Sequence, residues 1–143
     1  MKHRVVEAAG GREYDWTNDH IYVKTPADLT GGRVTVVVDT LKPGFHLARH
    51  YHKEMTEVFF ILEGEITFVF GAETVVATPG VTVTIPPNVV HEALSERGGK
   101  MITVFSPGGF DRYLEKLSSL SEAQSQDAGF MQSLAEKYDI WSA

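Results

Sequence analysis

The 143-residue sequence contains no cysteine. Disulfide bonds, thiolate zinc sites, iron–sulfur clusters and a cysteine nucleophile are therefore excluded. Any metal ion that the chain binds must be held by nitrogen and oxygen ligands. The lack of cysteine also leaves no sign of an oxidising compartment.

Basic residues are scarce, with 13 Lys and Arg against 19 Asp and Glu, and they form no basic run. The net charge of −6 argues against non-specific binding to nucleic acid or to an anionic membrane surface. No stretch approaches the roughly 20 apolar residues of a membrane span. The start, "MKHRVVEAAGG", does not have the pattern of a signal peptide. We therefore expect a cytoplasmic protein with no nucleic-acid or membrane partner.

The length and a hydrophobic content of 43% fit one compact domain over residues 1–143. A chain of this size buries roughly two-thirds of its unfolded surface, so a true core is possible. Up to residue 107, short β-rich runs alternate with Gly, Pro, Asn and Asp, which predicts an all-β barrel or sandwich. The predicted runs are 20–24, 33–41, 45–52, 57–64, 65–71, 73–79, 81–86 and 101–107.

The pattern becomes helical after "SPGGF", which predicts a C-terminal helical segment over about 109–140. A first helix is expected over 110–120. Ser121 is a candidate cap for a second helix over 122–140, interrupted near Gly129. Apolar stripes at helical spacing indicate that both helices pack against one end or face of the barrel.

The run "EVFFILEG" is apolar on both faces of a strand. Phe59 and Ile61 point to one side, while Phe60 and Leu62 point to the other. Because a two-sheet protein exposes one of these faces, either the helices or a partner subunit must cover it. We expect a homodimer built on an outer sheet face.

The stretch "HYHKEMTE" contains the strongest candidate site. His50 and His52 share one face of a strand, so both imidazoles can reach one ion. Glu57 is the first residue of the next predicted strand, and it shares a face with the apolar residues Phe59 and Ile61, which we expect to point inward. A buried carboxylate is unfavourable unless it is paired or bound to a cation, and a metal ion would satisfy it.

A His-x-His pair alone is weak support for a metal site, but a longer frame surrounds it. The frame has two parts, the first with Gly44, His50, His52, Glu57 and Gly64, and the second with Gly80, Pro86, Asn88 and His91. These residues and spacings resemble the two motifs of the cupin superfamily, in particular the small single-domain bacterial proteins of the quercetin-dioxygenase-like group.

The resemblance implies a double-stranded β-helix, which is a jelly-roll barrel of two antiparallel sheets, with C-terminal α-helices. It also implies that His50, His52, Glu57 and His91 bind one divalent transition metal ion inside the barrel. Asn88 stands where the second motif usually has glycine, and it tolerates left-handed backbone angles. Ser95 stands where the motif often has asparagine, a position that is not a metal ligand.

The ligand set suits Fe, Mn, Ni, Cu or Zn, and the sequence does not choose among them. A redox-active ion with open positions predicts a dioxygenase for a small oxygen-rich aromatic, flavonol-like or dicarbonyl substrate. A redox-inactive ion predicts an isomerase, a lyase or a polyketide-type cyclase. A metal-containing small-molecule binding protein is a third possibility. Glu57 is the candidate catalytic base. We expect Phe59, Phe68 and Phe105 to shape the pocket and His46 to lie at its rim.

Overall fold

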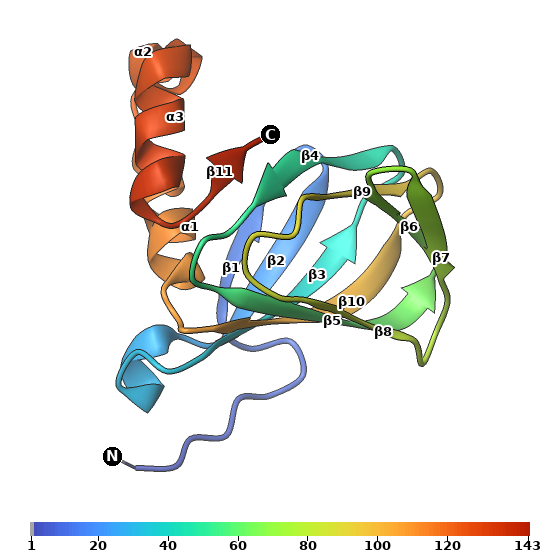
Figure 1. Ribbon diagram of the computed structural model, residues 1–143. Coiled ribbons are helices and arrows are strands. Elements are labelled where there is room, and N and C mark those ends of the chain that lie inside the picture. Colours follow the sequence, from blue (N-terminus) through green and yellow to red (C-terminus); the bar gives the residue numbers. More distant parts are fainter. Residues whose placement is uncertain (1) are drawn as a thin grey trace.

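The computed structural model describes residues 2–143 and contains two antiparallel sheets that enclose a barrel (Figure 1). One sheet has six strands in the order β1-β2-β3-β10-β5-β8. The β3–β10 pair joins segments far apart in the sequence, since Val37 lies opposite Thr103. The strands of this sheet are β1 (Arg12–Asp15), β2 (Asp19–Thr25), β3 (Thr35–Leu41), β10 (Gly99–Ser106), β5 (Thr56–Gly64) and β8 (Thr82–Ile85).

The second sheet has five strands in the order β11-β4-β9-β6-β7. Connections along the chain cross between the two sheets, as in the predicted jelly-roll barrel with C-terminal helices, which is confirmed. The strands of this sheet are β11 (Trp141–Ser142), β4 (Phe45–Tyr51), β9 (His91–Ser95), β6 (Ile66–Phe70) and β7 (Glu73–Ala77).

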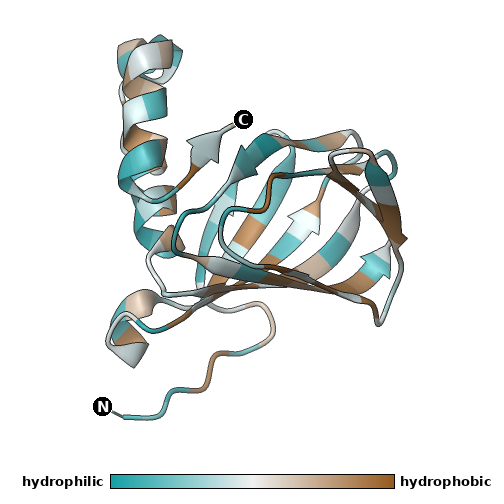
Figure 2. Ribbon diagram, in the orientation of Figure 1, coloured by the Kyte–Doolittle hydropathy of each residue, from teal (hydrophilic) through white to brown (hydrophobic). Residues whose placement is uncertain are grey.

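Side-chain alternation explains how the sheets close around a core (Figure 2). In β2 and β3 every second residue is buried over most of the strand, because successive side chains point to opposite faces. The inward faces of both sheets contribute to one apolar cluster. Its fully buried members are Phe59, Ile61, Ile66, Phe68, Ala77, Ile85 and Ala93.

Two turns depend on residues with positive φ. Gly64 ends β5 with φ 77°, and a Cβ there would lie 2.6 Å from the carbonyl oxygen of Gly98. A side chain at this position is therefore disfavoured by space as well as by conformation. Asn88 has φ 67°, so asparagine does supply the left-handed backbone that the departure from glycine required.

The C-terminal segment forms α1 (Phe110–Ser118), α2 (Glu122–Gln126) and α3 (Ala128–Lys137). Ser121 caps α2 by accepting a hydrogen bond from the Gln124 N–H, as predicted. The interruption predicted near Gly129 is present and lies at Asp127, two residues earlier. Asp127 ends α2 and caps α3 through the Phe130 N–H at 3.0 Å, which starts a new helix before the glycine.

The helices stand at one side of the barrel (Figure 1). α1 buries Leu114 in an apolar cluster with Phe105. The helices leave part of the outer sheet surface uncovered, since Phe60 is 40% exposed and Val76 is 55% exposed. The homodimer that would cover such a face stays a prediction. Within residues 2–143, no helix combines the length and the apolar character that a membrane crossing requires.

Three strands were not predicted, namely β1, β9 and β11. A short 3₁₀ helix, η1 (Ala27–Thr30), was also missed. The two-residue β11 pairs with β4, so that Ser142 lies opposite His50. This pairing brings the end of the described chain against the strand that holds the first of the predicted ligands.

Candidate metal centre

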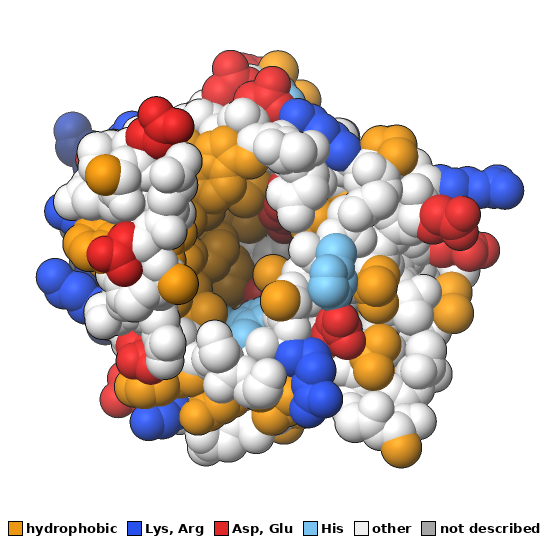
Figure 3. Space-filling model, turned by 90° about the horizontal axis from the view of Figure 1, so that it is seen from above, with side chains coloured by type: hydrophobic (Ala, Val, Ile, Leu, Met, Phe, Trp, Pro, Cys, Tyr) orange, Lys and Arg blue, Asp and Glu red, His pale blue; other side chains and the backbone are white. Residues whose placement is uncertain are grey.

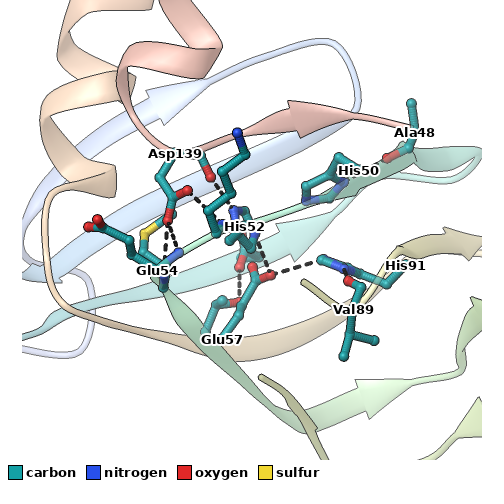
Figure 4. A network of polar contacts seen from close by, with 12 residues as sticks. Ala48, His50, His52, Glu54, Glu57, Val89, His91 and Asp139 are labelled. Carbon is teal, nitrogen blue, oxygen red and sulfur yellow. Dashed lines mark hydrogen bonds and ion pairs between the residues drawn. The ribbon is translucent and has the colours of Figure 1, made fainter. Parts of the chain in front are cut away.

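The structure brings the four predicted metal ligands together inside the barrel (Figure 4). His50 lies in β4, His52 follows that strand, Glu57 lies in β5 and His91 opens β9. One nitrogen or oxygen atom of each lies within 4.8 Å of those of the other three. All four residues are buried, with relative exposures of 0 to 9%.

Strand pairing explains why the histidines meet. β4 and β9 are neighbours, and His50 lies directly opposite His91. The register of this pair shifts between Leu47 and His50, which marks a β-bulge or a comparable irregularity. Because an irregular strand no longer keeps alternate residues on one face, His46 does not share the buried side of His50. His46 is exposed and its Nε2 lies 2.6 Å from Glu92 Oε2.

Each of the three imidazoles is held by a backbone carbonyl. Nδ1 of His50 donates to Ala48 at 2.7 Å, Nδ1 of His52 to Asp139 at 2.7 Å, and Nδ1 of His91 to Val89 at 2.9 Å. Because a carbonyl oxygen only accepts hydrogen bonds, each Nδ1 must carry the proton. In the neutral rings the Nε2 lone pairs are therefore free for a metal ion.

Glu57 lies among the Nε2 atoms, and a ring that donates to it from Nε2 carries a second proton, which a metal ion would replace. Its Oε1 is 3.2 Å from Nε2 of His52 and 3.2 Å from Nε2 of His91. Burial raises the pKa of Glu57, but the hydrogen bonds from His52 and His91 outweigh it and lower the pKa to about 2. Glu57 is therefore an ionised carboxylate at neutral pH.

The Glu57 carboxylate and burial shift the histidine pKa values in opposite directions. Burial lowers the pKa of His52, but the hydrogen bond and charge of Glu57 outweigh burial and raise it. Burial and the proximity of His91 lower the pKa of His50 to about 4, so this ring is neutral at pH 7. The site thus attracts positive charge to a cluster of buried nitrogen and oxygen donors. A divalent cation fits this donor set, and its binding would displace a proton from His52.

A contact that the sequence did not reveal fixes the loop between His52 and Glu57. The carboxylate of Asp139 accepts hydrogen bonds from the backbone N–H groups of Lys53, Glu54 and Met55 at 2.7, 2.9 and 2.8 Å. The carbonyl oxygen of the same Asp139 accepts the bond from His52 Nδ1. Asp139 has φ 64°, a conformation that suits Asp, Asn or Gly. One residue therefore orients both the loop and a candidate ligand.

A cavity of about 330 Å³ opens beside the candidate ligands. Figure 3 shows a hollow whose walls are mostly hydrophobic, with acidic and histidine side chains also visible. Phe59 and Phe105 line the cavity as predicted, whereas Phe68 is buried in the core and does not. Trp16, Asp19 and Asp39 also line it, and sequence analysis did not select any of them.

A family profile described as "Cupin domain" matches residues 37–105, which span both motifs and all four candidate ligands. The chain therefore contains a cupin domain. A curated relative, quercetin 2,3-dioxygenase of Bacillus subtilis (strain 168), is 33% identical over 89 residues. That alignment covers 62% of this chain and 26% of the relative, so the cupin matches about a quarter of the longer protein.

Solved structures share the cupin fold at low sequence identity. KdgF from Halomonas sp. has a TM-score of 0.68 at 16% identity, covering 78% of this chain and 99% of that one. An RmlC-like cupin from Shewanella frigidimarina has a TM-score of 0.67 at 21% identity, covering 78% and 96%. A Streptomyces PAC13 variant, solved with uridine, has a TM-score of 0.63 at 17% identity, covering 78% and 88%.

The departures from the cupin motifs leave the centre intact. Besides its left-handed turn, Asn88 donates its backbone N–H to the carbonyl oxygen of His52 at 2.6 Å. The Ser95 hydroxyl donates to the carbonyl oxygen of Glu65 at 2.8 Å. Asn88 thus holds the backbone next to His52, Ser95 holds the far end of β9 to the residue before β6, and neither contributes a candidate ligand.

Proposed function

We propose that this cupin binds one divalent transition metal ion through His50, His52, Glu57 and His91. We propose further that it is a dioxygenase for a small oxygen-rich aromatic, flavonol-like or dicarbonyl compound. The orientation of the three imidazoles is the main support, since each Nδ1 is tied to a carbonyl and the ring nitrogens gather around the buried Glu57. The similarity to a quercetin 2,3-dioxygenase favours this reaction class.

The protein groups have distinct tasks in this proposal. A redox-active ion bound by these donors would supply oxygenase chemistry. The aromatic wall formed by Phe59 and Phe105 holds the ring of the substrate and displaces water. Glu57 is also the candidate base, because it borders the cavity and would accept a proton from a substrate hydroxyl group on leaving the ion.

A non-redox cupin is the second candidate, acting as an isomerase, a lyase or a cyclase. Carboxyl groups elsewhere in the cavity favour it, since Asp19 and Asp39 line the same space as the centre and can serve proton transfer to a substrate that extends to them. A redox-inactive ion would then serve as a Lewis acid.

Metal reconstitution separates the two candidates. The metal-free protein is loaded in parallel with Fe, Mn, Ni, Cu or Zn, and oxygen uptake is followed with quercetin and with a β-diketone. A dioxygenase consumes oxygen with at least one redox-active metal and not with zinc, and Glu57→Gln abolishes the uptake. Substrate turnover with zinc under anaerobic conditions would instead establish the non-redox function. Absence of oxygen uptake with every redox-active metal and both substrates would overturn the dioxygenase proposal.

A further inference from the structure

Two buried aspartates in the cavity have no role in the candidate metal centre. Asp19 in β2 is 7% exposed and Asp39 in β3 is 6% exposed. Both line the cavity beside hydrophobic side chains. Among residues 2–143, none donates a hydrogen bond to Oδ1 of Asp19. An unpartnered buried carboxyl oxygen is unfavourable, and it marks this pair as more than a structural contact.

Sheet register places the two aspartates on one polar line. Asp19 lies opposite Leu41, which makes Asp39 its diagonal neighbour on the next strand. Asp39 lies opposite Met101, which makes Thr103 the next diagonal neighbour. These three polar side chains thus cross the inward face of β2, β3 and β10 in a single direction.

Moving once more to the diagonal neighbour on the next strand reaches the candidate metal centre. Thr103 lies opposite Phe59 on β5, and its diagonal neighbour in that direction is Glu57. The metal centre and Asp19 therefore lie at two ends of one polar line along a mostly apolar wall. Three strand spacings separate β2 from β5, which is about 14 Å between their backbones. A ligand that meets both ends must be extended and polar at each end.

Burial and mutual proximity favour a protonated acid in the aspartate pair. Burial raises the pKa of Asp19, and the adjacent charge of Asp39 raises it further. Burial also raises the pKa of Asp39, although hydrogen bonds from Asp19 and Thr103 oppose it. The Thr103 hydroxyl donates to Asp39 Oδ2 at 2.7 Å, so Asp39 is the acceptor and Asp19 is the better proton holder. A neutral acid next to a carboxylate presents both a donor and acceptors.

We infer that Asp19 and Asp39 form a second binding subsite, in which the acid pair binds a hydroxyl group of the substrate far from its metal-binding end. The inference rests on the proposed function, because both use the same cavity, and it narrows the substrate class. The substrate is an extended aromatic compound with a hydroxyl group at the end remote from the metal. A compound with an ether or a hydrogen at that end leaves the acid pair without a partner and binds more weakly.

Phenol and anisole test the subsite, because they differ only in the methyl group that removes the hydroxyl donor. Binding is measured by NMR titration on the metal-free protein in the absence of catalysis, so the result is independent of metal and oxygen chemistry. The wild type is expected to bind phenol about fivefold more tightly than anisole, as one hydrogen bond of about 1 kcal/mol predicts. Equal affinities for the two compounds would overturn the inference.

Substitutions at Asp19 locate the preference. Asp19→Asn keeps a neutral side chain that donates and accepts, so phenol affinity stays within about twofold of wild type. Asp19→Ala removes both functions, and phenol then binds no better than anisole. Asp15→Ala is the matched control, because Asp15 is exposed and does not line the cavity. A preference for phenol that survives in Asp19→Ala would refute the assignment.

A measurement on the wild-type protein tests the inference even if the alanine variant does not fold. Intermolecular NOEs between the phenol ring and the Thr103 methyl group are expected, because Thr103 lines the cavity beside Asp39. Binding of phenol without such NOEs would place it elsewhere and contradict the subsite.

Discussion

Removal of the Asp139 carboxylate is expected to weaken both the fold and the metal centre. Asp139→Gly is the appropriate substitution, because glycine accepts the φ of 64° and leaves the carbonyl bond to His52 available. The three loop N–H groups of residues 53–55 lose their acceptor. The resulting fall in stability measures how much these three hydrogen bonds contribute to holding the loop.

The magnitude follows from the exposure of the three donors. Met55 is 4% exposed, so its N–H remains unsatisfied at a cost of about 1–3 kcal/mol. Lys53 and Glu54 are exposed, and water replaces the carboxylate there at a loss of about 0.5 kcal/mol each. The free energy of unfolding is therefore expected to fall by about 2–4 kcal/mol. Because the loop carries His52 and Glu57 at its two ends, zinc affinity is expected to fall about tenfold.

Urea unfolding of the metal-free protein and zinc titration against a competing chelator measure the two effects. Asp127→Ala is the control, since it removes another aspartate that accepts a backbone N–H, at the start of α3. The control is expected to lose about 1 kcal/mol of stability and no zinc affinity. The reasoning would be refuted if Asp139→Gly lost less than about 0.5 kcal/mol, or if its zinc affinity matched that of the control.

Three further predictions concern the site and its scaffold. His50→Ala and His91→Ala should bind zinc far below one equivalent by elemental analysis while keeping a β-rich circular dichroism spectrum; full occupancy in either would contradict the ligand set. The pKa of His50 falls from 6.5 to about 4 on folding, so the neutral ring stabilises the metal-free protein above pH 6.5. About 3 kcal/mol should be lost as the pH falls from about 6.5 to 4, measured by urea unfolding, and an equal slope in His50→Ala would contradict this. Gly64→Ala should lower the melting temperature by several degrees, because its Cβ meets the Gly98 carbonyl; an unchanged midpoint in a thermal scan would show that the turn adapts.

Local patterns in the sequence predicted an all-β barrel or sandwich, and the resemblance to the cupin superfamily predicted the jelly-roll barrel and the four-residue cluster. Alternation and turn residues identify most strands, because each records the environment of its own segment. The cluster was predicted from two motifs whose spacing is fixed by turns at residues such as Gly64 and Asn88. β9 was missed because it begins with His91 and Glu92, which do not resemble a hydrophobic strand.

Long-range contacts account for what sequence analysis did not find. Asp139 meets the loop after His52 across more than 80 residues, and no local pattern records that contact. Asp19 and Asp39 became neighbours only through the register of β2 and β3. The exposure of His46 could not be predicted from β4 alone, because the irregularity in this strand lies in its pairing with β9.

The distribution of the candidate ligands between the sheets has a consequence for motion. The three histidines belong to the β4 and β9 side of the barrel, whereas Glu57 belongs to β5 of the opposite sheet. An ion held by all four would cross-link the two sheets, so separating them would break a coordination bond as well as apolar contacts. Amide hydrogens of β4, β5 and β9 would then exchange with deuterium more slowly when the ion is bound. Those of β7, at the edge of its sheet, would keep the same exchange rate.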